Sequence, residues 1–317
     1  MLPDLPESFP MEPLRHLIHA AQLLPARLAE LFTAADRLQA DDKARRLFPV
    51  LQGRILATLF YEPSTRTRLS FEAAMQKLGG SVLSVENARD SSSAVKGESI
   101  ADTVRVVAGY ADAIAIRHFQ EGTAAAAAAS SPVPVINAGD GIGEHPTQAL
   151  ADVYTIHREL GRLENLRVTL VGDLLYGRTI HSLLPLLAMY PGLQVHLVSP
   201  PSLRLPSRYL EALTAQGVRV HETDALEGAV AEADVVYVTR VQGERFASAS
   251  EYEAVKDAFV LNTRVAERLG GAAVIMHALP RLNEIAPEID QDPRAAYFRQ
   301  ARNGLYVRMA LLASMLG

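Results

Sequence analysis

Strand-like and helix-like segments alternate along most of this chain, and this alternation limits the folds that it can adopt. Runs of apolar and β-branched residues predict strands at residues 54–60, 81–85, 113–117, 134–137, 167–172, 194–198, 218–222, 235–238, 259–261 and 274–277. Helical spacing predicts helices near residues 25–38, 67–78, 98–109, 121–130, 147–160 and 297–316. Strands separated by crossover helices usually pair in parallel. We therefore expect an α/β fold of parallel β-sheets flanked by helices.

The length of the chain and one glycine-rich loop predict two domains. The chain has 317 residues, enough for about two domains of roughly 150 residues each. The polar loop NAGDGIGEHPT separates the two series of strands. We expect one domain at residues 1–146 and another at 147–295, each with its own sheet. The last helix, about 296–317, is apolar enough to pack on either domain, and we expect it to return to the first.

Charge and composition exclude several classes of protein. The formal net charge is −5 and the pI is near 6.0, so no bulk positive field attracts nucleic acid or a membrane surface. Cysteine is absent, which excludes disulfides, thiolate metal sites and a cysteine nucleophile. The opening MLPDLPESFPMEPLRHL does not resemble a signal peptide, and no run of about 18 uncharged apolar residues occurs. We expect a soluble, cytoplasmic protein.

A turn between a predicted strand and a predicted helix has the composition of a phosphate-binding site. It reads FYEPSTRTRLSF from Phe60 to Phe71, so Ser64–Thr67 fall at the helix N-terminus. Unpaired N–H groups and the helix dipole favour an anion there. Ordinarily such a serine or threonine only caps the helix, and such arginines point into water. Because Arg66 and Arg68 oppose the dipole of the first turn, the pattern predicts a bound anion.

Further polar clusters follow other predicted strands, at the edge where open α/β sheets bind ligands. They are Arg117–His118, Asp140–Gln148, Asp173–Arg178, Thr239–Gln242 and His277–Arg281. Any one of them alone would be an ordinary solvated loop. Their repeated placement predicts one ligand site assembled from strand ends.

Several segments, in this order and at this spacing, resemble the aspartate/ornithine carbamoyltransferases over nearly the whole chain. They are FYEPSTRTRLSFE, SSSAVKGESIADT, AIAIRHFQEG, NAGDGIGEHPTQALAD, VGDLLYGRTIHSL, YVTRVQGERF and HALPRLNEI. STRTR with HPTQ marks the wider family, whereas TRVQ and GDLLYGRT resemble its aspartate branch. The resemblance implies transfer of the carbamoyl group of carbamoyl phosphate to L-aspartate, giving N-carbamoyl-L-aspartate and phosphate, an early step of pyrimidine (UMP) synthesis. The first domain would bind carbamoyl phosphate and the second aspartate, with no cofactor and no metal.

The arginines in these motifs suit such substrates. Carbamoyl phosphate is a dianion and aspartate carries two carboxylates, so their site needs several guanidinium groups. Arg66, Arg117, Arg178 and Arg240 meet that need. The aspartate amino group would attack the carbamoyl carbon, and a tetrahedral oxyanion would expel phosphate, which can take up the amino proton. No covalent enzyme intermediate is required.

The resemblance also implies roles for individual residues. The carbamoyl phosphate site would comprise Ser64, Thr65, Arg66, Thr67, Arg117, His145, Gln148 and the backbone carbonyls of Leu279 and Pro280. The catalytic residues among them would be Arg66, Thr67, Arg117 and His145. The aspartate-binding residues would be Lys96, Arg178, Arg240 and Gln242.

Subunit and domain contacts follow from the same resemblance. Ser92 and Lys96 would enter the active site of the neighbouring subunit of a homotrimer. Regulatory or dihydroorotase chains are further candidate partners. Glu62 would pair with Arg178 and Arg245 when the domains close and exclude water.

His145 is open to several interpretations: a metal ligand, a general base, a neutral hydrogen-bond donor, or a helix-start histidine bonded only to backbone. HPTQ offers no second metal ligand within a helical turn. A neutral imidazole can polarise a carbonyl group, so we favour the donor.

Three positions depart from the family pattern. Ala278 stands where a proline is common, and Leu175 and Gly243 stand where other members often carry lysine. These changes affect the expected affinity for substrates more than the expected activity.

Rival functions fit the sequence less well. An ornithine carbamoyltransferase shares the phosphate half, but Arg240 does not suit a cationic side chain. A dinucleotide-binding dehydrogenase would need GxGxxG after a strand, where this chain has only Gly172 and Gly177. A non-catalytic relative would have no need of the full set of arginines.

Overall fold

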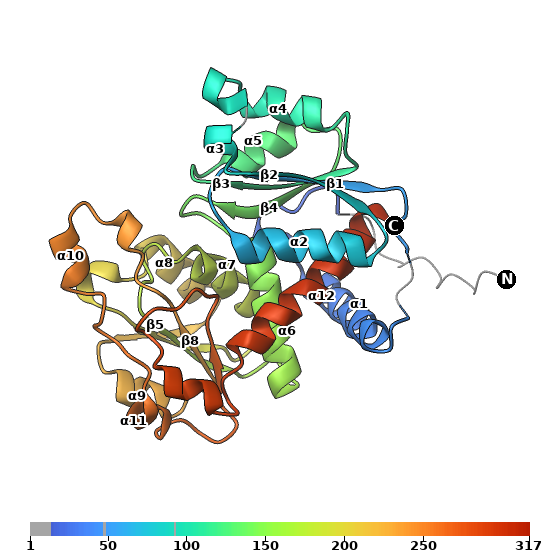
Figure 1. The fold of residues 1–317 in the computed structure, drawn as a ribbon. Coiled ribbons are helices and arrows are strands. Elements are labelled where there is room, and N and C mark those ends of the chain that lie inside the picture. The colour runs from blue at the N-terminus through green and yellow to red at the C-terminus, as the bar shows by residue number, and fades with distance from the viewer. Residues whose placement is uncertain (1–13, 47–48, 92) are drawn as a thin grey trace. The chain divides into compact units, whose positions relative to one another are not determined.

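The chain forms two compact units, shown in the computed structural model of Figure 1. The structure describes residues 14–317 except 47–48 and 92. The first unit comprises the described residues up to Leu150 together with Asn303–Gly317, and the second comprises Ala151–Arg302. Two helices, α6 (Pro146–Leu160) and α12 (Tyr297–Leu316), contribute residues to both units.

The described residues of the first unit form a four-stranded parallel sheet of order β2-β1-β3-β4. Its strands are β1 (Ile55–Phe60), β2 (Ser81–Glu86), β3 (Ala113–His118) and β4 (Val135–Asp140). β3 and β4 are buried throughout and β1 almost so, which explains their nearly continuous apolar sequences. Because the strands are parallel, their carboxyl ends share one edge of the sheet.

Helices cover both faces of this sheet. They are η1 (Ala20–Gln22), α1 (Pro25–Lys43), α2 (Thr65–Lys77), α3 (Ala88–Ser91), η2 (Ser93–Lys96), α4 (Ile100–Val107) and α5 (Thr123–Ser130), where η marks a 3₁₀ helix. Figure 1 shows α4 and α5 over one face and α2 over the other. Leu59 and Ile116 pack with Val104 and Ala127 in the core between the sheet and the first of these layers.

The second unit repeats this plan. Its described residues form a five-stranded parallel sheet of order β7-β6-β5-β8-β9. The strands are β5 (Arg167–Val171), β6 (Gln194–Val198), β7 (Arg219–Thr223), β8 (Val235–Val238) and β9 (Val274–Met276). The helices are α7 (Arg178–Leu187), η3 (Pro201–Leu203), α8 (Ser207–Ala215), α9 (Leu226–Val230), η4 (Gly243–Arg245), α10 (Ala249–Glu253), α11 (Thr263–Ala266) and η5 (Pro287–Gln291). The predicted α/β architecture with two parallel sheets is confirmed.

One predicted strand is wrong. Residues 259–261 form no strand; Leu261 makes a single bridge to Ile285. The Leu261 N–H donates to the Glu284 carbonyl, and the Leu261 carbonyl accepts from the Ala286 N–H, at 2.9 and 3.0 Å. The short apolar run is therefore buried against a loop, where one residue pairs and no ladder extends. The other predicted strands are found within three residues at each end.

Gly172, which directly follows β5, is a position where only glycine fits. Its φ is +110°, and an added Cβ would lie 2.4 Å from the carbonyl oxygen of Thr239, which follows β8. The glycine thus allows the ends of β5 and β8 to approach each other closely. This packing explains the glycine without a dinucleotide-binding role.

Gly172→Ala should lower the free energy of unfolding by about 2–5 kcal/mol, because it combines backbone strain with overpacking. Gly228→Ala is the matched control: it lies in α9 with no atom within 4 Å of an added Cβ. That change should be neutral or stabilising. Urea denaturation of both variants measures the difference, and equal stabilities would contradict the argument.

Candidate active site

The predicted phosphate cradle lies at the start of α2, with Ser64 as the N-cap residue and Thr65 as the first helical residue. Within the described structure, the Ser64 side chain makes no capping hydrogen bond, and no acidic residue occupies the first turn. Thr67 is buried and Arg66 is exposed. A serine hydroxyl, helix N–H groups and a guanidinium therefore gather where the dipole favours an anion.

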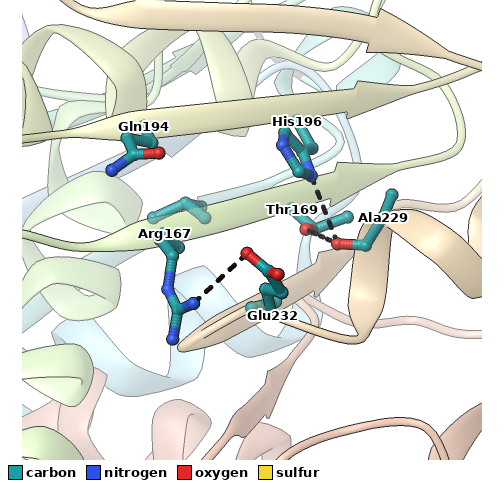
Figure 2. Close-up of a pocket in the computed structure, with 8 residues that line it drawn as sticks. Arg167, Thr169, Gln194, His196, Ala229 and Glu232 are labelled. Atoms are coloured by element: carbon teal, nitrogen blue, oxygen red, sulfur yellow. Dashed lines mark hydrogen bonds and ion pairs between the residues drawn. The ribbon is translucent and has the colours of Figure 1, made fainter.

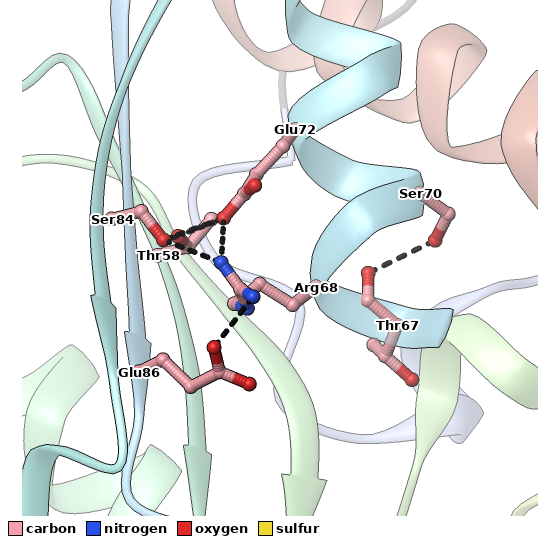
Figure 3. A network of polar contacts seen from close by, with 7 residues as sticks. All are labelled: Thr58, Thr67, Arg68, Ser70, Glu72, Ser84 and Glu86. Atoms are coloured by element: carbon pink, nitrogen blue, oxygen red, sulfur yellow. Dashed lines mark hydrogen bonds and ion pairs between the residues drawn. The ribbon is translucent and has the colours of Figure 1, made fainter. Parts of the chain in front are cut away.

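The second arginine of this turn is balanced by the protein itself. Arg68 Nη1 lies 3.3 Å from Glu72 Oε1 and 3.2 Å from Ser84 Oγ, and its Nη2 lies 2.7 Å from Glu86 Oε2. Thr67 and Arg68 point to opposite sides of the start of α2 (Figure 3). The sequence predicts that both arginines face a bound anion. For Arg68 this prediction is wrong, because the carboxylates of Glu72 and Glu86 balance its charge.

Two further predicted residues lie at the carboxyl edge of the sheet in the first unit. His145, just before α6, has its Nε2 3.4 Å from Thr67 Oγ1, and both side chains are buried. Arg117, near the end of β3, is also buried, and its Nη1 donates to the Ala138 carbonyl at 3.3 Å. Its Nη2 lies 3.2 Å from Glu62 Oε2. The Glu62–Arg117 pair and the Thr67–His145 pair thus both lie at the carboxyl edge of this sheet.

The remaining predicted residues of the first unit are less tightly held. Gln148 is half-buried in the first turns of α6. Lys96 is the last residue of η2 and is exposed. Ser92 lies outside the described residues.

In the second unit, a buried carboxylate ties two strand ends together. Asp173, after β5, accepts the Tyr176 N–H at 2.9 Å and the Gln242 N–H at 3.3 Å. Gln242 Nε2 donates to the Tyr176 carbonyl at 2.8 Å. Burial raises the pKa of Asp173 despite these hydrogen bonds. The predicted aspartate-binding residue Gln242 is therefore held against the loop that leads to Arg178, the first residue of α7.

Arg240, the other predicted carboxylate binder, already forms a two-pronged pair. Its Nη1 and Nη2 lie 3.0 and 2.5 Å from the two carboxylate oxygens of Glu244. The hydrogen bond to Glu244 raises the pKa of Arg240; burial opposes ionisation of Glu244, but Arg240 lowers its pKa overall. Nearby, a Cβ on Gly243 would lie 3.2 Å from the Tyr252 ring, so a side chain at this position would require the ring to shift by a few tenths of an ångström.

The turn that carries the Leu279 and Pro280 carbonyls follows β9. The peptide bond between these residues is cis, Leu279 is half-buried and Pro280 is exposed. Leu279 N–H donates to Nδ1 of the buried His277 at 2.7 Å, and His277 Nε2 lies 2.8 Å from Glu284 Oε1. The turn therefore begins next to a buried polar pair, His277 and Glu284.

Comparison with known families settles the relationship of the chain. Residues 15–158 match the model described as aspartate/ornithine carbamoyltransferase, carbamoyl-P binding domain. Residues 164–315 match the model described as aspartate/ornithine carbamoyltransferase, Asp/Orn binding domain. The chain belongs to the aspartate/ornithine carbamoyltransferase family. Its enzyme class, carbamoyltransferase, follows from that membership, and the resemblance seen in the motifs is confirmed.

Three relatives are similar to this chain along most of their own length. A chloroplastic aspartate carbamoyltransferase of Oryza sativa subsp. japonica is 50% identical over 306 residues, covering 95% of this chain and 84% of that protein. An aspartate carbamoyltransferase catalytic subunit of Thermococcus onnurineus is 52% identical over 283 residues, covering 89% and 91%. The structure of Trypanosoma cruzi aspartate transcarbamoylase in complex with carbamoyl phosphate has a TM-score of 0.91 at 40% identity, covering 96% and 97%.

Three residues that hold predicted site residues or their neighbours were not identified from the sequence of this carbamoyltransferase: Glu244, Glu284 and Glu86. Glu244 stands four residues after Arg240, a spacing that could have indicated the ion pair. His277 belongs to a polar cluster at a strand end, but Glu284, seven residues on, follows no periodic pattern. Glu86 reaches Arg68 only because β2 lies beside β1.

Acid should remove the contribution of Glu284 to stability. Burial opposes ionisation of this carboxylate, but hydrogen bonds from His277 and backbone N–H groups lower its pKa overall. A lowered pKa stabilises the folded state above the ordinary value of 4.5, and this stabilisation is lost as the pH falls below it. Glu284→Gln should therefore cost about 1–3 kcal/mol at pH 7 and less at pH 4.

Urea denaturation at both pH values measures this difference. The exposed Glu288→Gln is the control and should have little effect at either pH. A cost that does not shrink in acid would contradict the argument.

The structure of this carbamoyltransferase also contains a small cavity, shown in Figure 2. It lies at the edge of the second sheet where the strands begin, opposite their carboxyl ends. Arg167 and Gln194, the first residues of β5 and β6, line it with His196 and Glu232. Its volume of about 20 Å³ is room for about one water molecule. We assign it no ligand.

Other features of the described residues can be stated briefly. No three histidine, aspartate or glutamate side chains among them are grouped as a metal ion would require. Over the same residues, none of the helices combines the length and the apolar character needed to cross a membrane.

Proposed function

We propose that this chain is an aspartate carbamoyltransferase: it transfers the carbamoyl group of carbamoyl phosphate to the amino group of L-aspartate. The products are N-carbamoyl-L-aspartate and phosphate, which places the reaction early in pyrimidine synthesis. Relatives named aspartate carbamoyltransferase, about half identical to this chain, support the choice of substrates. Its cysteine-free sequence fits the reducing cytoplasm, where we propose that it works.

The observation that carries this proposal is the cradle at the start of α2, with Thr67 Oγ1 3.4 Å from His145 Nε2 and Arg117 at the same sheet edge. Ser64, Thr65, Arg66, Thr67 and Arg117 would hold the phosphate group. Thr67, Arg117 and His145 would donate to the carbamoyl oxygen, and Gln148 with the Leu279 and Pro280 carbonyls would orient the carbamoyl NH₂ group.

Catalysis would rest on juxtaposition and on stabilisation of charge. The aspartate nitrogen forms a bond to the carbamoyl carbon, whose oxygen becomes an oxyanion facing preorganised donors. The C–O bond to phosphate then breaks, and the departing phosphate takes the amino proton. Arg178, Arg240, Gln242 and Lys96 would bind the aspartate carboxylates, with Arg240 on the side-chain carboxylate.

We further propose that the active protein is a homotrimer in which Ser92 and Lys96 serve a neighbouring active site. Lys96 is exposed at the end of η2, as such a contribution requires. Glu62, which lies 3.2 Å from Arg117, would exchange partners for Arg178 and Arg245 when substrate is bound. Light scattering of the purified protein measures the assembly.

The experiment that tests the function is a phosphate-release assay with carbamoyl phosphate and either L-aspartate or L-ornithine. Release with aspartate alone is the expected result, because Arg240 matches a carboxylate and would repel the ornithine ammonium group. Release with ornithine alone would replace the proposed substrate by the second candidate of the family.

A further inference from the structure

A buried histidine below the Leu279–Pro280 turn, His277, forms hydrogen bonds through its backbone N–H and through both ring nitrogens. Its backbone N–H donates to Gln300 Oε1 at 2.9 Å, its Nδ1 accepts from Leu279 N–H at 2.7 Å, and its Nε2 lies 2.8 Å from Glu284 Oε1. The side chains of His277 and Glu284 are 3% and 6% exposed. The pair is therefore closed to bulk water.

These contacts assign the tautomer of His277. A backbone N–H can only donate, so Nδ1 must carry a lone pair. The ring proton then sits on Nε2, where it donates to the Glu284 carboxylate. Placing a proton on Nδ1 would set two donors against each other and break the bond to Leu279.

The pair holds both ends of the turn. Leu279 N–H is held by His277 Nδ1, and Leu282 N–H donates to Glu284 Oε2 at 3.0 Å. The Leu279 side chain packs on the core of the second unit and Arg281 pairs with Asp290, whereas Pro280 and Leu282 are exposed. Leu279 also has a φ of +56°, a region that residues with a side chain rarely adopt. Besides these side-chain contacts, the hydrogen bonds to His277 and Glu284 fix the direction of the backbone N–H groups at Leu279 and Leu282.

His277 is in turn fixed to the frame of the second unit. Gln300, which accepts from its backbone, donates through Nε2 to Asp152 Oδ1 at 2.7 Å. Asp152 Oδ2 accepts from the Tyr237 hydroxyl at 2.9 Å. Asp152 and Tyr237 are fully buried, and Gln300 nearly so. A continuous polar chain thus runs from α6, β8 and α12 to the base of the turn.

We propose that His277 is a positioning residue for carbamoyl phosphate: through Leu279 N–H it sets the direction of the Leu279 and Pro280 carbonyls that receive the carbamoyl NH₂ group. This inference rests on the proposed function, which assigns those carbonyls to the substrate. His277 touches no reacting atom. Glu284 acts one step further away, by keeping the proton on Nε2.

The proposal predicts a selective loss that a structural role would not cause. The carbonyls meet only the carbamoyl NH₂ group, which inorganic phosphate lacks. A misdirected turn should therefore weaken carbamoyl phosphate and leave phosphate binding unchanged. General damage to the fold would weaken both ligands together.

Two substitutions separate the two ring nitrogens. His277→Asn offers an amide oxygen three bonds from Cα, as Nδ1 is, and so can still accept from Leu279 N–H. His277→Gln offers its amide four bonds from Cα, as Nε2 is, so it can reach Glu284 but leaves Leu279 N–H without an acceptor. Both remove the ring, which makes each the control for the other.

The measurement is the Kd of carbamoyl phosphate and of inorganic phosphate by calorimetry, with melting temperatures alongside. His277→Gln should raise the carbamoyl phosphate Kd roughly tenfold or more, with the phosphate Kd within about twofold. His277→Asn should stay within roughly threefold for both. Equal losses in the two variants, or parallel losses for the two ligands, would overturn the proposal.

Glu284→Gln decides the matter if neither histidine variant folds. Its amide has one acceptor oxygen for two donors, His277 Nε2–H and Leu282 N–H, so the turn should lose one of its two hydrogen bonds to the His277–Glu284 pair or have it weakened. Carbamoyl phosphate should weaken while phosphate does not; an unchanged ratio of the two Kd values would refute the positioning role. If the unmodified protein binds carbamoyl phosphate no better than phosphate, the proposed function itself fails, a result distinct from either.

Discussion

Arg66→Ala should lower kcat/KM for carbamoyl phosphate by about 10²- to 10³-fold, the usual cost of one preorganised donor to developing charge. The α2 start combines this guanidinium with helix N–H groups, a Ser64 hydroxyl not spent on capping and a first turn without acid. Removing the guanidinium leaves the hydroxyls and the dipole, so residual activity should persist. Initial rates of phosphate release at varied carbamoyl phosphate concentration measure the loss.

The melting temperature should hardly change in this variant, because Arg66 is exposed. Arg37→Ala is the matched control, since this arginine of α1 lies in the same unit and its side chain is 56% exposed. It removes the same charge and should leave kcat/KM unaltered. If kcat/KM of Arg66→Ala stays within about threefold of that of the unmodified protein, the assignment of the cradle to the active site is wrong.

Arg240→Ala should have an effect of similar size on the other substrate. We expect kcat/KM for aspartate to fall by about 10²- to 10³-fold, because a carboxylate loses its two-pronged partner. The Kd of carbamoyl phosphate should stay the same. Arg240→Lys keeps the charge but not the planar fork, and should recover little of the activity.

The Arg240 guanidinium has a fixed orientation, because its Nη1 and Nη2 donate to the two carboxylate oxygens of Glu244 at 3.0 and 2.5 Å. Arg264→Ala is the control in the same unit; its side chain is 76% exposed and pairs with Glu227. Loss of carbamoyl phosphate affinity in Arg240→Ala, to the same degree as loss of aspartate use, would contradict the assignment of Arg240 to the carboxylate of aspartate.

Much of the fold could be predicted because buried parallel strands have a strong sequence signal. Strands such as Val235–Val238 are apolar throughout and lie between helical segments. Residues 259–261 have the same local composition, but what decides their structure is their partner, Ile285 in a loop, and no local pattern reports that.

The same distinction between local sequence pattern and tertiary partner applies to the residues of the candidate site. Residues at strand ends or helix starts, such as Arg117 and Thr67, could be placed at one edge of the sheet, because the fold determines where strand ends lie. Side chains that orient them could not. Arg68 looks like a ligand-binding arginine in the sequence, and only the pairing of β1 with β2 brings Ser84 and Glu86 to it.

The division of the chain between its units has a consequence for how the protein is made. Ala151–Arg302 is one uninterrupted stretch, whereas the first unit needs Asn303–Gly317 in addition to its earlier residues. During synthesis the stretch that completes the second unit leaves the ribosome before the last piece of the first. In the first unit, Tyr306 then supplies a hydroxyl to Asp42 at 3.0 Å, and Arg308 lies over the Phe71 ring of α2. The helix that carries the cradle therefore gains this packing partner only after the whole second unit has been synthesised, and the anion site is the later of the two halves to mature.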